Sequence, residues 1–213
     1  VPDDAGVAIE YGIPLTSKRI DFILTGQNAN QQDTAVIVEL KQWSKVSKTD
    51  KDGVVSTFVG GGQREQAHPS YQAWTYAALI QDFNQTVQEE HIQLAPCAYL
   101  HNCVVDQDVK DAFYQPHTDK APVFVRDDVE ALQAFIQNHI RTGDRNRLLY
   151  RIDGGKLKPS KSLIDHLSSL LQGNREFQLI DDQKLVYEAG LDLAKKAQEK
   201  ERKQVLIVEG GPG

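Results

Sequence analysis

The sequence predicts an α/β protein in which a mixed central sheet is flanked by helices and followed by a helical extension. Short segments rich in Val, Ile and Phe dominate residues 7 to 41, where strands are expected. From residue 69 to about 141, helical patterns alternate with further strand patterns. Beyond residue 160, two helical patterns follow one another with no strand between them, which sets the extension apart from the sheet domain.

Three strands are expected before the first helix. Residues 7–11 and 18–25 are joined by the segment GIPLTS, which suits a hairpin connection. Residues 35–41 form the third strand. A turn centred near residues 15 and 16 would bring residues 10 and 21 opposite each other.

The middle of the chain alternates between helices and strands. Pro69 suits the first position of a helix that continues to about residue 83. Strands follow at 92–105 and 121–126. Asp127 or Asp128 then caps a helix whose apolar residues have helical spacing, namely Val129, Leu132, Phe135, Ile136 and Ile140.

The pattern after residue 141 divides the chain into four parts. Residues 1–141 are expected to be the sheet domain, 142–160 a basic linker, 161–203 the helical extension and 204–213 the first strand and phosphate-binding turn of another domain. The helix after Ser160 or Ser162 ends near Gly173, and a long charged helix covers 181–203. The linker is either a solvated connector or a surface for phosphates, because basic residues outnumber acidic ones there.

Length and charge limit the possible functions. The chain has 213 residues, 40% of them hydrophobic, which is enough for one good core and the beginning of a second domain. A net charge of −6 excludes an overall basic field, so any contact with nucleic acid must come from local patches. No apolar run approaches a membrane span, and Cys97 and Cys103 lie too far apart on one predicted strand for a disulfide. A cytoplasmic protein without a membrane partner is therefore expected.

Charged residues gather on one face of the first strands. Because strand side chains alternate, Asp21 lies on one face of its strand, and Glu39 and Lys41 share one face of theirs. If the strands are neighbours these three converge, and Glu10 can join them from the first strand. Arg19 shares the face of Asp21 and is expected to contact substrate.

The chemistry of this cluster follows from its charges. Carboxylates aimed at one point repel each other unless a cation lies between them, and oxygen ligands favour Mg²⁺ or Mn²⁺. In phosphodiester hydrolysis such a metal polarises the phosphate and acidifies a water, while a neighbouring lysine orients that water. An Asp followed by Glu-x-Lys on the next strand supplies these groups.

The helix 69–83 adds polar residues near the same region. Gln72 and Tyr76 are one turn apart and therefore lie on one helix face. His68 precedes the helix, where it either contacts a phosphate or serves as a capping or buried residue.

Taken in order, Glu10, Asp21, Glu39-x-Lys41 and Gln72-x-x-x-Tyr76 resemble the PD-(D/E)XK nuclease superfamily. The Gln-Tyr pair on a helix resembles its RecB-like branch. The resemblance covers residues 7 to 141 and implies the restriction-endonuclease-like fold. Ile20 stands where the superfamily's name has Pro, and this Pro is often absent from active members.

The resemblance implies a role for each of these residues. Asp21, Glu39 and the main-chain carbonyl of Leu40 would bind Mg²⁺ or Mn²⁺, with Glu10 as the upstream acid. Lys41 would be the catalytic lysine.

It implies that Gln72 and Tyr76 position the substrate or the groups around the metal. The substrate would be nucleic acid, with DNA favoured. The competing interpretation is a non-catalytic module of the same fold that binds nucleic acid or regulates a partner. A homodimer is also possible.

The end of the chain resembles something more particular. A strand pattern runs into Gly210, Gly211, Pro212 and Gly213, as at the start of many phosphate-binding loops. With RIDFIL, VELKQW, AHPSYQAWTYA and DDQKLVYEAG, this segment resembles bacterial proteins in which a nuclease domain precedes a P-loop ATPase of the Schlafen-group DNA/RNA helicase type. ATP would bind only in a longer protein, because the Lys and Ser/Thr of the loop are missing here.

Overall fold

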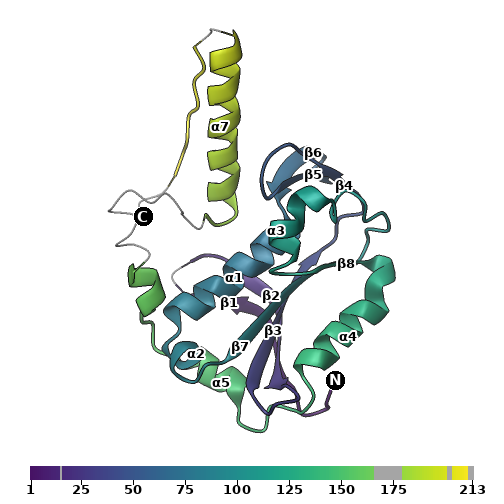
Figure 1. The fold of residues 1–213 in the computed structure, drawn as a ribbon, viewed down its shortest axis with the longest axis vertical. Helices are drawn as coiled ribbons and strands as arrows, with labels where there is room; N and C mark the ends of the chain where they lie inside the picture. Colours follow the sequence, from purple (N-terminus) through teal and green to yellow (C-terminus); the bar gives the residue numbers. More distant parts are fainter. Residues whose placement is uncertain (15, 166–178, 201–202, 211–213) are drawn as a thin grey trace.

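A five-stranded mixed sheet organises the chain (Figure 1). The computed structural model describes residues 1–14, 16–165, 179–200 and 203–210. In space the strand order of this sheet is β1-β2-β3-β7-β8. The first three strands are antiparallel, and the last two run parallel to β3. The bounds are β1 (Gly6–Gly12), β2 (Arg19–Gln27), β3 (Asp33–Lys41), β7 (Gln93–Leu100) and β8 (Val123–Val125). The predicted α/β class with a mixed central sheet is confirmed.

The hairpin register is the one that the sequence predicts. Tyr11 pairs with Ile20 and Ile9 with Phe22, so Glu10 falls opposite Asp21. In the pairing of β2 with β3, Phe22 lies opposite Val38, so Asp21 falls opposite Glu39.

Helices cover both faces of the sheet. On one face, α1 (Pro69–Phe83) packs Tyr76 and Ile80 against Ile23 and Ile37. On the other, α4 (Val129–His139) packs Phe135 and its apolar neighbours against Leu24, Val36 and Val38. Figure 1 shows the sheet between these two helices. Strands covered on both faces are expected to be apolar, as the Val, Ile and Leu content of β3 shows.

Strand β7 is shorter than the sequence predicts. It ends at Leu100, and Cys103 lies in the turn that follows, with its backbone N–H bonded to the Leu100 carbonyl. Pro96 is tolerated inside the strand because β8 pairs only from Ala98 onward, which leaves the Pro96 nitrogen without a ladder to interrupt on that side. Both cysteines are buried and free.

A second, small sheet was not predicted. It is antiparallel, in the order β4-β5-β6, and lies between β3 and α1 in the chain. The turn between its last two strands uses Gly60 and Gly61, both with positive φ, as tight hairpins require. Its central strand, VVSTFV, has a strand composition, but the polar residues of the two flanking strands weakened the signal for a sheet. Its strands are β4 (Val46–Lys48), β5 (Val54–Val59) and β6 (Gly62–Ala67).

The predicted basic linker is part of the folded body. Residues 142–160 contain α5 (Leu148–Asp153), whose Leu148 and Ile152 are 1% and 2% exposed in the core beneath α1. Arg151 forms ion pairs with Asp33 and Glu90. The apolar pair at i, i+4 decides the packing, and the basic residues around it obscured that pair in the sequence.

Short helices complete the loops of this body. They are α2 (Gln85–Glu89), α3 (Gln115–Thr118) and the single 3₁₀ turns η1 (Ala112–Tyr114) and η2 (Arg126–Asp128). Asp128, one of the two predicted candidates, occupies the N-cap position of α4, but its side chain accepts from the Val125 N–H and makes no cap hydrogen bond to α4. Among the residues described, every helix is too short or too polar to cross a bilayer.

Two parts of the predicted extension are described. Residues 161–165 are helical, and the Ser160 hydroxyl accepts a hydrogen bond from the Leu163 N–H, so Ser160 caps this helix. The rest of it, to Gly173, lies outside the described residues. The long helix α7 (Asp182–Lys200) extends away from the sheet (Figure 1).

Residues 203–210 run alongside α7 in Figure 1 and form no strand. A strand requires a hydrogen-bonding neighbour, and the described chain places none beside this segment. Gly210 is exposed, while Gly211, Pro212 and Gly213 lie outside the described residues. The nucleotide-binding loop therefore stays a prediction.

One buried lysine attaches the start of α7 to the body. Lys184 Nζ lies 2.7 Å from Asp52 Oδ2 and 3.0 Å from Glu188 Oε1, and its side chain is only 8% exposed. Asp52 also lies 2.7 Å from His117 Nε2 of α3. These contacts connect α7 to the loop before β5.

We predict that Lys184→Ala loosens α7, because it leaves Glu188 buried without its cation and breaks the contact with Asp52. The expected cost is about 1 to 2 kcal/mol, since Asp52 is largely solvated. Faster hydrogen exchange in α7 would measure it. Lys196→Ala is the matched control, because Lys196 pairs with Asp192 inside the same helix. Equal exchange rates in the two variants would contradict the prediction.

Candidate active site

The start of β2 and the end of β3 lie side by side at one end of these strands and bring the predicted acids together. Asp21 Oδ2 accepts a hydrogen bond from the Leu40 backbone N–H at 2.7 Å. The antiparallel register explains this contact, because Asp21 lies across from Glu39 once Phe22 pairs with Val38. The Asp21 side chain therefore takes the place of a ladder hydrogen bond at the fraying strand end.

Glu39 is the buried centre of the site. The residue is 3% exposed, and its Oε1 lies 2.7 Å from Lys41 Nζ. Its other oxygen, Oε2, is buried and has no hydrogen-bond partner among the described residues. Glu39 follows Ile37 on the face that α1 covers, which is why a carboxylate at this position is enclosed.

The electrostatics of Glu39 follow from this enclosure. Burial raises the pKa of its carboxyl to about 7, against the opposing charge of Lys41. The charges of Asp21 and Asp181 act in the same direction as burial. Lys41 balances part of this charge at Glu39, and Lys18 lies beside Asp181.

Helix α1 contributes the predicted pair. Gln72 Nε2 donates to the Tyr76 hydroxyl at 2.8 Å, and this hydroxyl donates to Asp181 Oδ2 at 2.6 Å. Burial, together with the hydrogen bond to Asp181, raises the pKa of Tyr76, so its hydroxyl keeps its proton. Tyr76 is 2% exposed and fixed at both ends of this chain of hydrogen bonds.

Asp181 is the residue that sequence reasoning missed. It precedes α7, far along the chain from Glu39, and an Asp at a helix start indicates a cap rather than a site. Its Oδ1 is buried without a hydrogen-bond partner among the described residues, and Lys18 Nζ lies 3.3 Å from its Oδ2. No sequence spacing could have connected it to the site.

The structure does not bring Glu10 into the cluster. Its register opposite Asp21 is as predicted, but its backbone is left-handed with φ of 56°. This turn breaks the strand alternation. The side chain is 58% exposed and lies 3.7 Å from Arg19, which is itself 65% exposed. In this structure Glu10 therefore lies beside Arg19 at the surface, and its role as the upstream acid stays a prediction.

His68 has the capping role, one of its two predicted alternatives. It is fully buried; its Nδ1 accepts from the Ser70 N–H at 3.1 Å, and its Nε2 lies 2.8 Å from the Val109 carbonyl oxygen. Burial lowers its pKa to about 4, so the ring is neutral near pH 7. Both ring nitrogens are engaged, which corrects the expectation that His68 contacts substrate.

The donor set is one that a magnesium ion accepts. Mg²⁺ is commonly held by one or two carboxylates together with waters and substrate phosphates. Asp21 and the free oxygen of Glu39 supply such a pair. Across the described ranges, no three His, Cys, Asp or Glu side chains are close enough to hold a metal by themselves.

Comparison with known proteins adds no relative. No family model, curated protein or solved structure matches the chain. The resemblance to nucleases therefore depends on the residues of the site and on the arrangement of the strands that carry them.

We predict that the metal-free protein loses stability as the pH rises from about 4.5 to about 7. The pKa of Glu39 is raised on folding from 4.5 to about 7, so the folded state holds this proton more tightly than the unfolded chain. The loss is of the order of 2 to 3 kcal/mol. Urea unfolding in EDTA at several pH values measures it.

Glu39→Gln is the matched variant, because its amide oxygen can still accept from Lys41. It should be more stable than the wild type at pH 8 and equal to it at pH 4.5. His68 contributes the opposite slope, since its lowered pKa removes stability as the pH falls from 6.5 to about 4. Both proteins contain His68, so its contribution cancels when the unfolding free energies of the wild type and Glu39→Gln are subtracted. A difference that does not change with pH would refute the role of Glu39.

Proposed function

We propose that this chain is a Mg²⁺-dependent nuclease domain that hydrolyses phosphodiester bonds, with DNA as the favoured substrate. One observation carries the proposal. Asp21, Glu39 and Lys41 come from two neighbouring strand ends and lie beside the hydrogen-bonded Gln72 and Tyr76 of α1. The charges of Asp21 and Glu39 act on each other, and that of Glu39 acts on Tyr76, so these residues occupy one site.

The strand order supports the same proposal. The antiparallel strands β1, β2 and β3 are followed, after α1, by β7, which runs parallel to β3. Asp21 lies on β2 and Glu39 on β3. The restriction-endonuclease-like fold would require this arrangement, and we propose that fold for this chain. The helices on both faces agree with it.

The residues divide the chemistry among themselves. Asp21 and Glu39 would hold the metal, which supplies a Lewis acid for the phosphate and a more acidic water. Lys41 donates to Glu39 and can orient a water or offset the charge that develops on the phosphate. Gln72 and Tyr76 would position the substrate or the groups around the metal.

A substrate would approach from the side of Asp21 and Lys41. Glu39 is enclosed, whereas the side chain of Lys41 is 16% exposed and Asp21 is half-buried. Arg19, exposed at the start of β2, could contact a phosphate on the same strand. The accessible edge of the site therefore carries both a carboxylate and cations.

We predict that Lys41→Ala lowers metal-dependent cleavage at least about a hundredfold, because it removes a charge that acts on the transition state. The wild type, incubated with linear DNA, circular DNA and RNA, should yield products with Mg²⁺ or Mn²⁺ and none with EDTA. The substrate that is cut decides the class.

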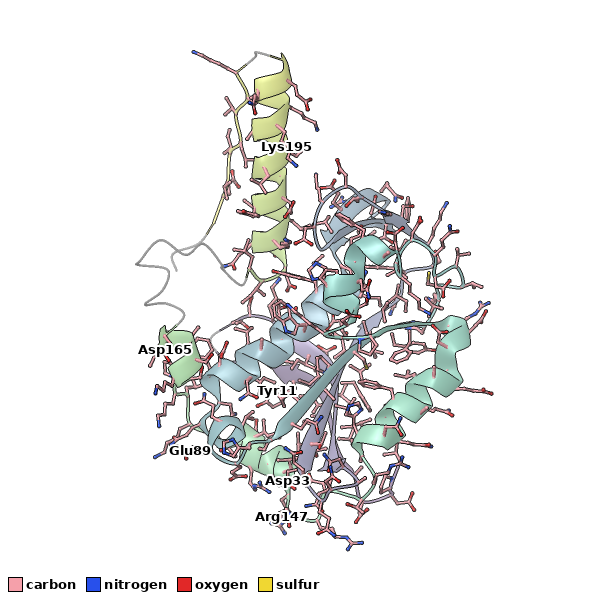
Figure 2. The ribbon with its side chains drawn as sticks, viewed as in Figure 1. Tyr11, Asp33, Glu89, Arg147, Asp165 and Lys195 are labelled. Atoms are coloured by element: carbon pink, nitrogen blue, oxygen red, sulfur yellow. The ribbon has the colours of Figure 1, made fainter. Side chains whose placement is uncertain are left out.

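Lys195→Ala is the control, since Lys195 is exposed on α7, away from the sheet (Figure 2). It should cleave like the wild type, and circular dichroism should show both variants folded. The non-catalytic binding module replaces this proposal if the wild type yields no product from any substrate and the wild type and Glu39→Gln bind DNA with equal affinity.

A further inference from the structure

The segment before α7 crosses the helix that carries Gln72 and Tyr76. The Tyr71 hydroxyl of α1 donates to the Leu179 carbonyl. Ile180 packs against the core cluster beneath α1. Two residues after Asp182, the Lys184 side chain reaches Asp52 and fixes the start of α7. We call residues 179–184 the docking segment.

Asp181 lies at the centre of the docking segment and is held there tightly. Its side chain is 9% exposed, and its Oδ2 lies 2.6 Å from the Tyr76 hydroxyl and 3.3 Å from Lys18 Nζ. Its φ of 40° is a left-handed conformation that costs a non-glycine residue free energy. The surrounding contacts therefore impose this position on Asp181.

The second oxygen of Asp181 is the unexplained part. Oδ1 is buried and has no hydrogen-bond partner among the described residues, as is also true of Glu39 Oε2. Buried polar atoms are normally satisfied, because desolvating one without a partner costs about 1 to 3 kcal/mol. Tyr76 needs only one acceptor, which a neutral amide would supply. Lys18 and Tyr76 both contact Oδ2, so the ion pair and the hydrogen bond account for that oxygen and leave Oδ1 without a role.

We propose that Asp181 is a positioning residue of the metal site, which strengthens cation binding with its charge and accepts a hydrogen bond from a metal-bound water through Oδ1. This inference rests on the proposed function. Bound Mg²⁺ and Mn²⁺ keep several waters, so a carboxylate outside direct ligand distance can still act on the ion. The docking segment thus makes the extension part of the site.

The test measures Mn²⁺ affinity without nucleic acid, by titration calorimetry or by the signal of free Mn²⁺ in electron paramagnetic resonance. Asp181→Asn keeps an acceptor for Tyr76 and removes the charge. We expect it to weaken Mn²⁺ binding at least about tenfold, because a unit charge within about 8 Å of a divalent ion at an effective dielectric constant near 20 contributes more than the free energy of a tenfold change.

Asp182→Asn is the matched control, because Asp182 is the next residue, also pairs with Lys18, and has a side chain that is 83% exposed. It should bind Mn²⁺ within about twofold of the wild type. Asp181→Glu restores the charge and should recover part of the lost affinity. Wild-type affinity in Asp181→Asn, or equal losses in the two Asn variants, would overturn the inference.

Glu39→Gln separates this inference from the proposed function. If the wild type binds no Mn²⁺, both fail. If the wild type binds and Glu39→Gln does not, while Asp181→Asn binds normally, only the role of Asp181 fails. Should Asp181→Asn not fold, Asp181→Ser takes its place, since it also removes the charge; unchanged affinity in that variant would refute the positioning role.

Discussion

The enclosure of the Glu39 carboxylate is the constraint on which the other features of the site depend. A charge at the end of β3, on the face that α1 covers, costs several kcal/mol unless its neighbours compensate. Lys41 compensates in part, yet Asp21 and Asp181 add charge of the same sign. A chain under selection for stability alone would replace Glu39 with an apolar residue. Its presence, with one oxygen unpaired, is therefore better explained by function than by folding.

The same constraint explains why the helical extension belongs to the site. The acid next to Tyr76 comes from residue 181 and not from the sheet domain. For Asp181 to lie there, the chain must return across α1, and contacts at Leu179 and Lys184 hold it on both sides. Movement of α7 relative to the sheet would change the charge around Glu39. The extension and the site thus share the contact between Asp181 and Tyr76.

Much of the arrangement around β2 and β3 could be predicted because it depends on local rules. Alternation along a strand placed Asp21 and Glu39 on one face, and a short connection limited the hairpin register. Helical spacing paired Gln72 with Tyr76. The same rules failed for Glu10, whose left-handed backbone breaks the alternation, and for His68, where sequence could not choose between a cap and a ligand. They also missed the small sheet, although the VVSTFV of β5 has a strand composition.

The sequence by itself determined the α/β class, the order of the main elements, and the pairing of acids with a lysine at the end of a strand. These follow from periodicity and from short-range spacing. Only the tertiary structure decided that Asp181 joins them, that residues 142–160 pack in the core through Leu148 and Ile152, and that Glu39 is enclosed. Each of these depends on contacts between residues far apart in the chain, and no local pattern encodes which distant segment will cover a given face.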